Sequence, residues 1–263
     1  MPHLRLSIIA VLIALVGVAR ADEVPPQLDA ATALVHRIQQ SENKYVFGGN
    51  DVSFPSQPAN GATDSQACLM KADCSGFVNA LFAHTFKLNS QQMKTWLGLS
   101  RPNAENYFKA IEKERGFERI THIKDTRGGD VMAMAYQRNY NGKATGHVML
   151  VAGAAEKIEP REPIVEGTTQ WEVPVIDSAI TAHGPTDTRY RKGEDGKDAT
   201  GVGLGKIRVY LDEQGVCVGY TWGVDRSREK DFYPRSDRPI AVGRPSRDAV
   251  RALTAEKAAE KVD

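Results

Sequence analysis

A cysteine preceded by an aspartate begins an apolar helical pattern in the first third of this 263-residue chain. After Cys74, apolar residues follow at offsets of three, four, seven and eight, the spacing of a helix with one buried face. Asp73 is a favourable N-cap, and the partial positive charge at a helix N-terminus stabilises a thiolate. The sequence therefore predicts a reactive thiol in the first turn of a helix that ends near Lys87. The alternative is a Cys74 that is buried or bridged for structural reasons.

A thiol nucleophile needs a base and a third group that orients the base. His147 is the best candidate for the base, because it opens the apolar strand 147–151, where a buried imidazole needs a polar partner. His84 lies about 15 Å along the Cys74 helix, too far to serve the same sulfur. The other histidines after residue 21 are expected on a helix surface (His36), on a strand (His122) and in a loop where a substrate could touch it (His183).

Asp177 is the predicted third member, at the end of the strand 173–177. Alternation along a strand puts its side chain on the same face as Val173 and Val175. If this strand pairs antiparallel with the one that His147 opens, the carboxylate can accept a hydrogen bond from the imidazole, fixing its tautomer and favouring its charged form. The alternative is that Asp177 caps a turn with Ser178.

Helical patterns come first along the chain and strand patterns follow, which predicts an α+β fold with a mainly antiparallel sheet. The helical patterns cover 28–40, 74–87 and 104–114. The strand patterns cover 117–123, 131–136, 147–153, 173–178, 206–211 and 216–222. The last two strands are predicted to form a hairpin.

Polar, turn-rich segments separate or follow these elements. Residues 50–72 are interpreted as a loop, and residues 183–205 as a long surface loop that borders the site. Beyond Pro234 the composition predicts a polar tail, helical in part but outside the core. The predicted organisation is a signal peptide (1–21), a catalytic domain with a C-terminal hairpin (22–233) and the tail (234–263).

Residues 1–21 resemble a secretory signal, with Arg5, an apolar run and an Ala-Arg-Ala cleavage site. We expect an exported protein, periplasmic or secreted, with no membrane span after signal removal. Without Arg5 and Arg20, 34 basic residues become 32 against 33 acidic ones, a net charge of about −1. Such a balance argues against a nucleic-acid partner.

The cysteine count also limits the chemistry. Three cysteines, an odd number, leave at least one thiol outside any intramolecular disulfide, and Cys68 could pair with Cys217 if Cys74 is free. The spacing of histidines and cysteines matches no metal-ligand pattern, so we expect no metal and no cofactor.

Three segments resemble, in this order along the chain, motifs of the NlpC/P60 superfamily of papain-like cysteine peptidases. They are Asp73–Val78, Gly129-Asp130-Val131 and Gly146-His147-Val148. Tyr45–Gly49 is similar to the tyrosine-containing Gly-Gly motif that precedes the nucleophile in that family. The resemblance covers roughly residues 28–180.

The resemblance implies a papain-like fold with Cys74 as nucleophile, His147 as base and Asp177 as orienting residue. The family often has His, Asn or Gln in the third position, so Asp177 departs from its pattern. Tyr45 is implied as a wall or donor near the oxyanion, with Asp73 and Ser75 beside it. The implied substrates are peptidoglycan peptides or another small amide.

Two other functions are compatible with the sequence. A papain-like amidase or acyltransferase acting on lipid or small-molecule amides would have an apolar tunnel beside Cys74. A non-enzymatic exported binding protein would have Cys74 in a disulfide or out of reach of His147.

Overall fold

The computed structural model describes residues 24–55, 68–137, 144–193 and 196–259. The predicted signal peptide, residues 1–21, lies outside the described residues. Within the described part of the chain, none of the helices has both the length and the apolar character that a membrane span requires.

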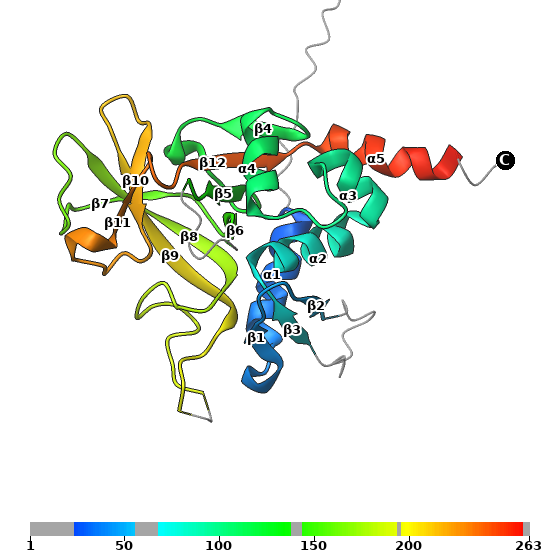
Figure 1. Cartoon of the computed structure of the whole chain (residues 1–263), viewed down its shortest axis with the longest axis horizontal. Helices are drawn as coiled ribbons and strands as arrows, with labels where there is room; N and C mark the ends of the chain where they lie inside the picture. The colour runs from blue at the N-terminus through cyan, green and yellow to red at the C-terminus, as the bar shows by residue number, and fades with distance from the viewer. Residues whose placement is uncertain (1–23, 56–67, 138–143, 194–195, 260–263) are drawn as a thin grey trace, which may run out of the picture.

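Helices gather beside one end of a large sheet (Figure 1). The α-helices are α1 (Pro26–Arg37), α2 (Cys74–Phe86), α3 (Ser90–Leu97), α4 (Ala104–Glu112) and α5 (Arg247–Ala259). The 3₁₀ turns are η1 (Gln40–Glu42), η3 (Ile123–Asp125) and η5 (Glu229–Asp231). The strands are β1 (Asn43–Tyr45), β2 (Asn50–Ser53), β3 (Leu69–Ala72), β4 (Phe117–Ile120), β5 (Val131–Ala135), β6 (Gly146–Val151), β7 (Glu156–Ile158), β8 (Thr169–Ala179), β9 (Gly201–Leu211), β10 (Cys217–Thr221), β11 (Phe232–Pro234) and β12 (Ile240–Pro245).

The main sheet has nine strands in the order β11-β10-β9-β8-β6-β5-β12-β4, with β7 pairing on β8. The pairings within it are antiparallel, including the predicted hairpin of β9 and β10. A second, three-stranded sheet of β1, β3 and β2 lies beside α2. The α+β fold with a mainly antiparallel sheet, predicted from the sequence, is confirmed.

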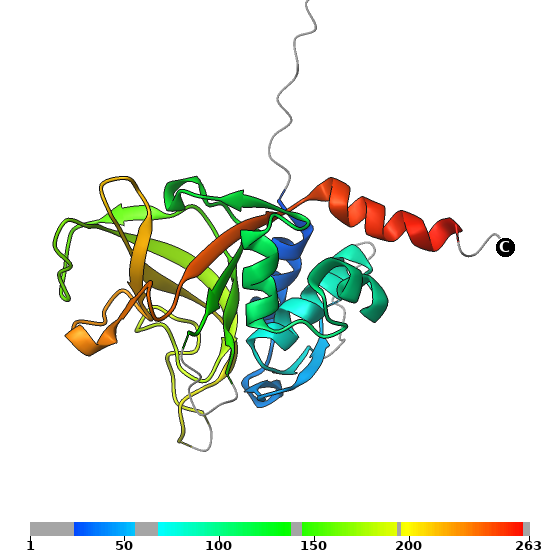
Figure 2. The same cartoon turned by 45° about the horizontal axis from the view of Figure 1, so that its top comes forward.

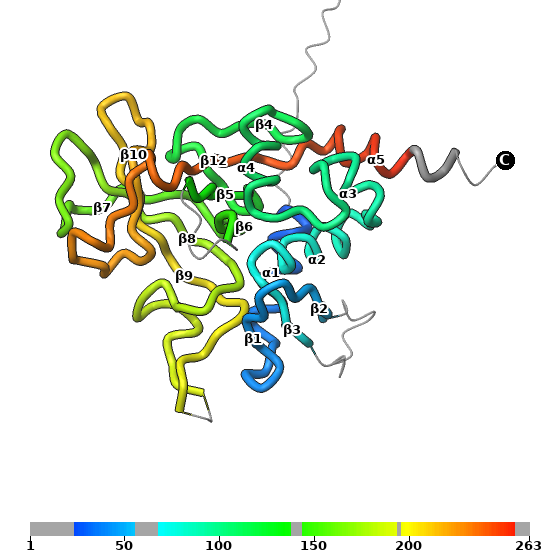
Figure 3. Tube along the Cα trace, in the orientation of Figure 1, coloured from blue at the N-terminus to red at the C-terminus, as the bar shows by residue number. Residues whose placement is uncertain are grey.

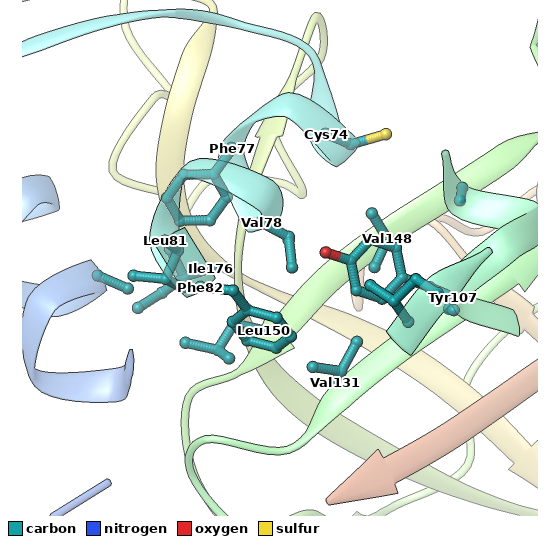
Figure 4. Close-up of a cluster of buried hydrophobic side chains, with 14 of the residues drawn as sticks. Cys74, Phe77, Val78, Leu81, Phe82, Tyr107, Val131, Val148, Leu150 and Ile176 are labelled. Carbon is teal, nitrogen blue, oxygen red and sulfur yellow. The ribbon is translucent and has the colours of Figure 1, made fainter. Parts of the chain in front are cut away.

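Apolar side chains fill both faces of the main sheet. On one face, α2 and α4 pack on β5 and β6 through a cluster that includes Phe77, Val78 and Leu81 from α2 (Figure 4). A second cluster, on the other face, includes Met132, Val173 and Val209. The period of the apolar residues after Cys74 therefore marks the buried face of α2, as predicted.

The segment after Pro234 differs from the predicted polar tail. Residues 240–245 form β12, which pairs with β5 on one side and β4 on the other (Figure 2). Ala241 and Val242 are buried, and Arg244 forms an ion pair with buried Asp130 at 2.9 Å. The apolar run Ile240–Gly243 is short, and the surrounding Arg, Pro and Ser residues dominate the composition. The sequence pattern therefore did not predict a strand here.

Two predicted loops also contain regular structure. In the segment 50–72, β2 and β3 pair with each other, while residues 56–67 lie outside the described residues. In the segment 183–205, β9 begins at Gly201, and the preceding residues fold back along it (Figure 3). The Thr188 amide donates to the Leu204 carbonyl there at 2.9 Å. Glycine and polar residues on a strand do not produce the apolar alternation by which a strand is predicted.

We predict that ending the chain after residue 239 abolishes cooperative unfolding, whereas ending it after residue 246 does not. The first truncation removes β12, leaves the edges of β4 and β5 unpaired and exposes the core that Ala241 and Val242 cover. The second removes only α5. Thermal unfolding followed by circular dichroism measures the difference, and equal transitions in the two truncated proteins would contradict the prediction.

Candidate active site

Cys74 is the first residue of α2, and Asp73 is its N-cap. One carboxylate oxygen of Asp73 accepts the Gly76 amide at 2.6 Å and the Ser75 hydroxyl at 3.0 Å. Figure 4 shows the sulfur directed away from the apolar cluster. The cap thus fixes the first turn of the helix and holds the thiol at the edge of the core.

A tight turn at 45–49 lies against this helix start. The Gly48 amide donates to the other oxygen of Asp73 at 2.9 Å. A Cβ at Gly76 would lie 2.1 Å from the Gly49 carbonyl oxygen, so only glycine permits this contact. The motifs around Tyr45 and Cys74, predicted separately from the sequence, therefore lie together in space.

Tyr45 carries a phenol beside the thiol. Burial, together with negative charge on Cys74 and Asp73, raises the pKa of Tyr45 well above its ordinary value. The phenol therefore keeps its proton and can donate a hydrogen bond.

The imidazole of His147 and the carboxylate of Asp177 are in direct contact. Their Nε2 and Oδ2 atoms lie 2.6 Å apart, and both side chains are buried. The contact forms because β6 and β8 pair antiparallel, which is the condition that the sequence analysis set for it. Ser178 does not join Asp177 in a turn: its hydroxyl donates to the Ala72 carbonyl at 2.8 Å.

The second neighbour of His147 is Cys74. Because Nε2 meets Asp177, Nδ1 is left for the thiol, which lines the same pocket. Burial alone would lower the pKa of His147, but negative charge on Cys74 and hydrogen bonds with Asp177 and Cys74 outweigh it and raise the pKa to about 10.

Asp177 has two further partners that sequence reasoning did not predict. His183 Nε2 lies 3.2 Å from Oδ2, and Arg189 Nη2 lies 2.8 Å from Oδ1. Burial alone would raise the pKa of Asp177, but Arg189 and the two histidines hold it well below the ordinary value. The carboxylate is therefore charged and ready to accept from His147. His183, predicted as a loop residue that could touch substrate, is instead buried behind His147.

Arg189 is itself held by Asp187, whose carboxylate accepts from its Nη2 at 2.7 Å and from its Nε at 3.0 Å. Both side chains lie over glycines of β9. A Cβ at Gly203 would lie 2.4 Å from Arg189 Nε, and one at Gly205 would lie 2.5 Å from the Asp187 carboxylate. The sequence did contain one signal for this contact: glycines occupy alternate positions of the strand. Alternate residues of a strand lie on the same face, and glycines there allow another segment to approach closely.

The thiol, the imidazole and Tyr45 line one pocket of about 530 Å³. Trp222 covers the histidines, with its ring centroid 4.9 Å from that of His147 and 4.4 Å from that of His183. The remaining lining residues come from both halves of the fold: Phe47, Gly48, Asp73, Ser75, Arg101, Pro102, Asn103, Ala104, Tyr136, Ala144, Thr145, Gly146, Ala179, Ile180, Thr181, Arg226, Asp231, Tyr233 and Arg238.

The other candidate residues lie elsewhere. Cys68, Cys74 and Cys217 are all free thiols, so the suggested pair of Cys68 with Cys217 is absent. Among the described residues, no three His, Cys, Asp or Glu side chains gather closely enough to hold a metal ion. His36, His84 and His122 are exposed, and His122 lies after the end of β4 instead of on a strand.

A helix that begins with a cysteine, packed on an antiparallel sheet that supplies a histidine and its polar partner, is the arrangement of papain-like cysteine hydrolases. The NlpC/P60 family matches residues 42–170, a range that includes Cys74 and His147 and ends before Asp177. The chain therefore belongs to the NlpC/P60 family, as its motifs indicated. It is similar to the uncharacterized protein R653 of Acanthamoeba polyphaga mimivirus, with 30% identity over 229 residues, which cover 84% of this chain and 96% of the viral protein. No solved structure matches the chain significantly.

We predict that Arg189→Met lowers the free energy of unfolding by about 3–5 kcal/mol, because it leaves buried Asp177 without its strongest counter-charge. It should also slow alkylation of Cys74 by iodoacetamide at acidic pH, as the pKa of Asp177 rises. Denaturant unfolding and the pH profile of alkylation measure the two effects. Arg191→Met, which removes an exposed arginine from the same segment, is the control and should change neither.

We predict that Cys74→Ser lowers the pKa of His147 by about 1–3 pH units, because it removes the negative charge that raises this pKa. With the raised pKa, imidazolium at His147 stabilises the native fold fully below its ordinary pKa of 6.5, and this contribution is lost as the pH rises through about 10. NMR titration of the ring protons measures the change, with exposed His36 as the reference. An unaltered His147 titration would show that the thiol carries no charge.

Proposed function

We propose that this protein is an exported cysteine hydrolase that cleaves amide bonds in peptidoglycan peptides, with Cys74, His147 and Asp177 as its catalytic residues. The observation that carries the proposal is the 2.6 Å contact of buried Asp177 with His147, which lines the same pocket as the Cys74 thiol. Membership of the NlpC/P60 family supports peptidase or amidase chemistry. The signal sequence expected in residues 1–21 supports export.

The proposed reaction proceeds through a thioester. His147 takes the proton of Cys74, and the sulfur attacks the amide carbonyl carbon. The backbone amide of Cys74 at the helix start and the hydroxyl of Tyr45 stabilise the oxyanion. His147 then protonates the departing amine, and a water molecule, deprotonated by His147, releases the acid and restores the thiol.

Asp177 has a positioning role in this sequence of steps. Its charge and its hydrogen bond fix His147 with Nδ1 toward the sulfur and stabilise the imidazolium. Arg189 and His183 in turn keep the carboxylate charged.

The character of the pocket supports a polar substrate. Arginines, Asn103 and Thr145 stand among its lining residues, where the substrate of a lipid amidase would require an apolar tunnel. The free thiol of Cys74, which lines the same pocket as His147, argues against a binding protein with structural cysteines.

We predict that the protein without residues 1–21 releases new amine and carboxyl termini from purified peptidoglycan fragments, observed by mass spectrometry. Cys74→Ala should abolish the reaction, and Asp177→Asn should slow it by about a hundredfold or more. His84→Gln changes an exposed histidine outside the pocket and is the matched control.

Two results would contradict the proposal. Undiminished cleavage by Cys74→Ala would exclude the thioester, and a Cys74 that resists iodoacetamide would exclude an activated thiol. Cleavage of long-chain acyl amides in place of peptidoglycan peptides would favour the lipid amidase.

A further inference from the structure

Two large apolar side chains that line the pocket beside Cys74 are exposed to solvent. Phe47 is 59% exposed and Ile180 is 62% exposed. Elsewhere in the described part of the chain, the exposed large apolar side chains do not line this pocket: Val24, Val46, Leu99, Ile164 and Tyr190. Single exposed apolar residues are common on protein surfaces, so it is the position of these two at the mouth of the pocket that indicates contact with a ligand.

The two side chains come from different halves of the fold, and hydrogen bonds bring their segments together. Ala179, at the end of β8, pairs with Gly201 on β9. The Tyr45 amide, at the end of β1, donates to the Thr200 hydroxyl at 3.1 Å. Thr200 therefore lies between the ends of β1 and β8, and strand spacing makes the distance between the backbones of Tyr45 and the residue after Ala179 roughly 10 Å.

Backbone hydrogen bonds hold both segments in place. The Gly48 amide, next to Phe47, donates to Asp73 at 2.9 Å. The carbonyl of Thr181, the residue after the isoleucine, accepts from Trp222 Nε1 at 3.1 Å, and the same tryptophan ring lies against the catalytic imidazole. Apolar side chains on a fixed backbone bind a ligand group with little loss of conformational entropy.

The apolar contact is confined to the mouth of the pocket. Polar side chains such as Arg101, Asn103 and Thr145 line other parts of it. A long acyl chain would need a continuous apolar lining, whereas a leucine-sized side chain on an otherwise polar peptide needs only the two side chains at the mouth. The lining therefore fits one compact apolar group close to the thiol.

We propose that Phe47 and Ile180 together bind one compact apolar side chain of the substrate, beside the scissile amide, and so determine specificity. This inference rests on the proposed function, because it names the substrate class of the same thiol. The preferred substrates are peptides with an apolar residue next to the bond that is cleaved.

Alkylation of Cys74 tests this preference with defined probes. N-isobutyl iodoacetamide carries a leucine-like group, and N-(carbamoylmethyl) iodoacetamide is its neutral, polar partner of similar shape. N-dodecyl iodoacetamide represents a long acyl chain. In each reaction the sulfur displaces iodide and forms a thioether. Rates are measured by mass spectrometry and divided by the rates with β-mercaptoethanol, which corrects for the intrinsic reactivity of each probe.

We expect the isobutyl probe to react about tenfold faster than its polar partner, as partial burial of a leucine-sized group allows. Phe47→Gln and Ile180→Gln should each lower this ratio about threefold, and the double variant should bring it close to one. Both residues are exposed, so circular dichroism should show that the variants fold. Ile164→Gln changes an isoleucine of similar exposure outside the pocket and should keep the full ratio.

Three results would overturn this inference while the activated thiol remained established. They are equal rates for the isobutyl and polar probes, a full ratio in the double variant, and a dodecyl probe that reacts much faster than the isobutyl probe. Slow reaction of the unaltered protein with every probe would instead contradict the proposed function.

Discussion

The structure depends on the contacts that the fully buried carboxylate of Asp177 makes with its neighbours. Burying a charge costs several kcal/mol unless it is paired, and here Arg189, His183 and His147 all pair with the same group. His147 lies on β6, while His183 and Arg189 both lie between β8 and β9, so the carboxylate links these two segments. The glycines of β9 provide the space in which Arg189 and Asp187 lie.

The two halves of the fold supply different parts of the site. The helical half provides the thiol, the helix cap and the phenol of Tyr45, while the sheet provides the imidazole, its carboxylate and two of the arginines. Packing of α2 on β6 aligns them, and the hydrogen bond from Ser178 to Ala72 links the strand of Asp177 to the residue before the cap. A shift between the halves would separate Cys74 from His147.

Local patterns in the sequence were sufficient to predict the helix of Cys74, the pairing of His147 with Asp177 and the fold class. Each depends on periodicity, capping or order along the chain. The ion pair of Arg189 could not be predicted, because it joins residues whose proximity is set by how a polar segment folds back on β9. Strand β12 was missed for a related reason: a short apolar run pairs with strands more than a hundred residues away.

That position of β12 also determines when the sheet can be completed. Because β12 lies between β4 and β5, the sheet that carries His147 stays divided until residues 240–245 have been synthesised. Pairing at such sequence separation is slow, since a long loop must close before the contacts form. The strands that carry His147 and Asp177 are therefore made well before the sheet around them is complete.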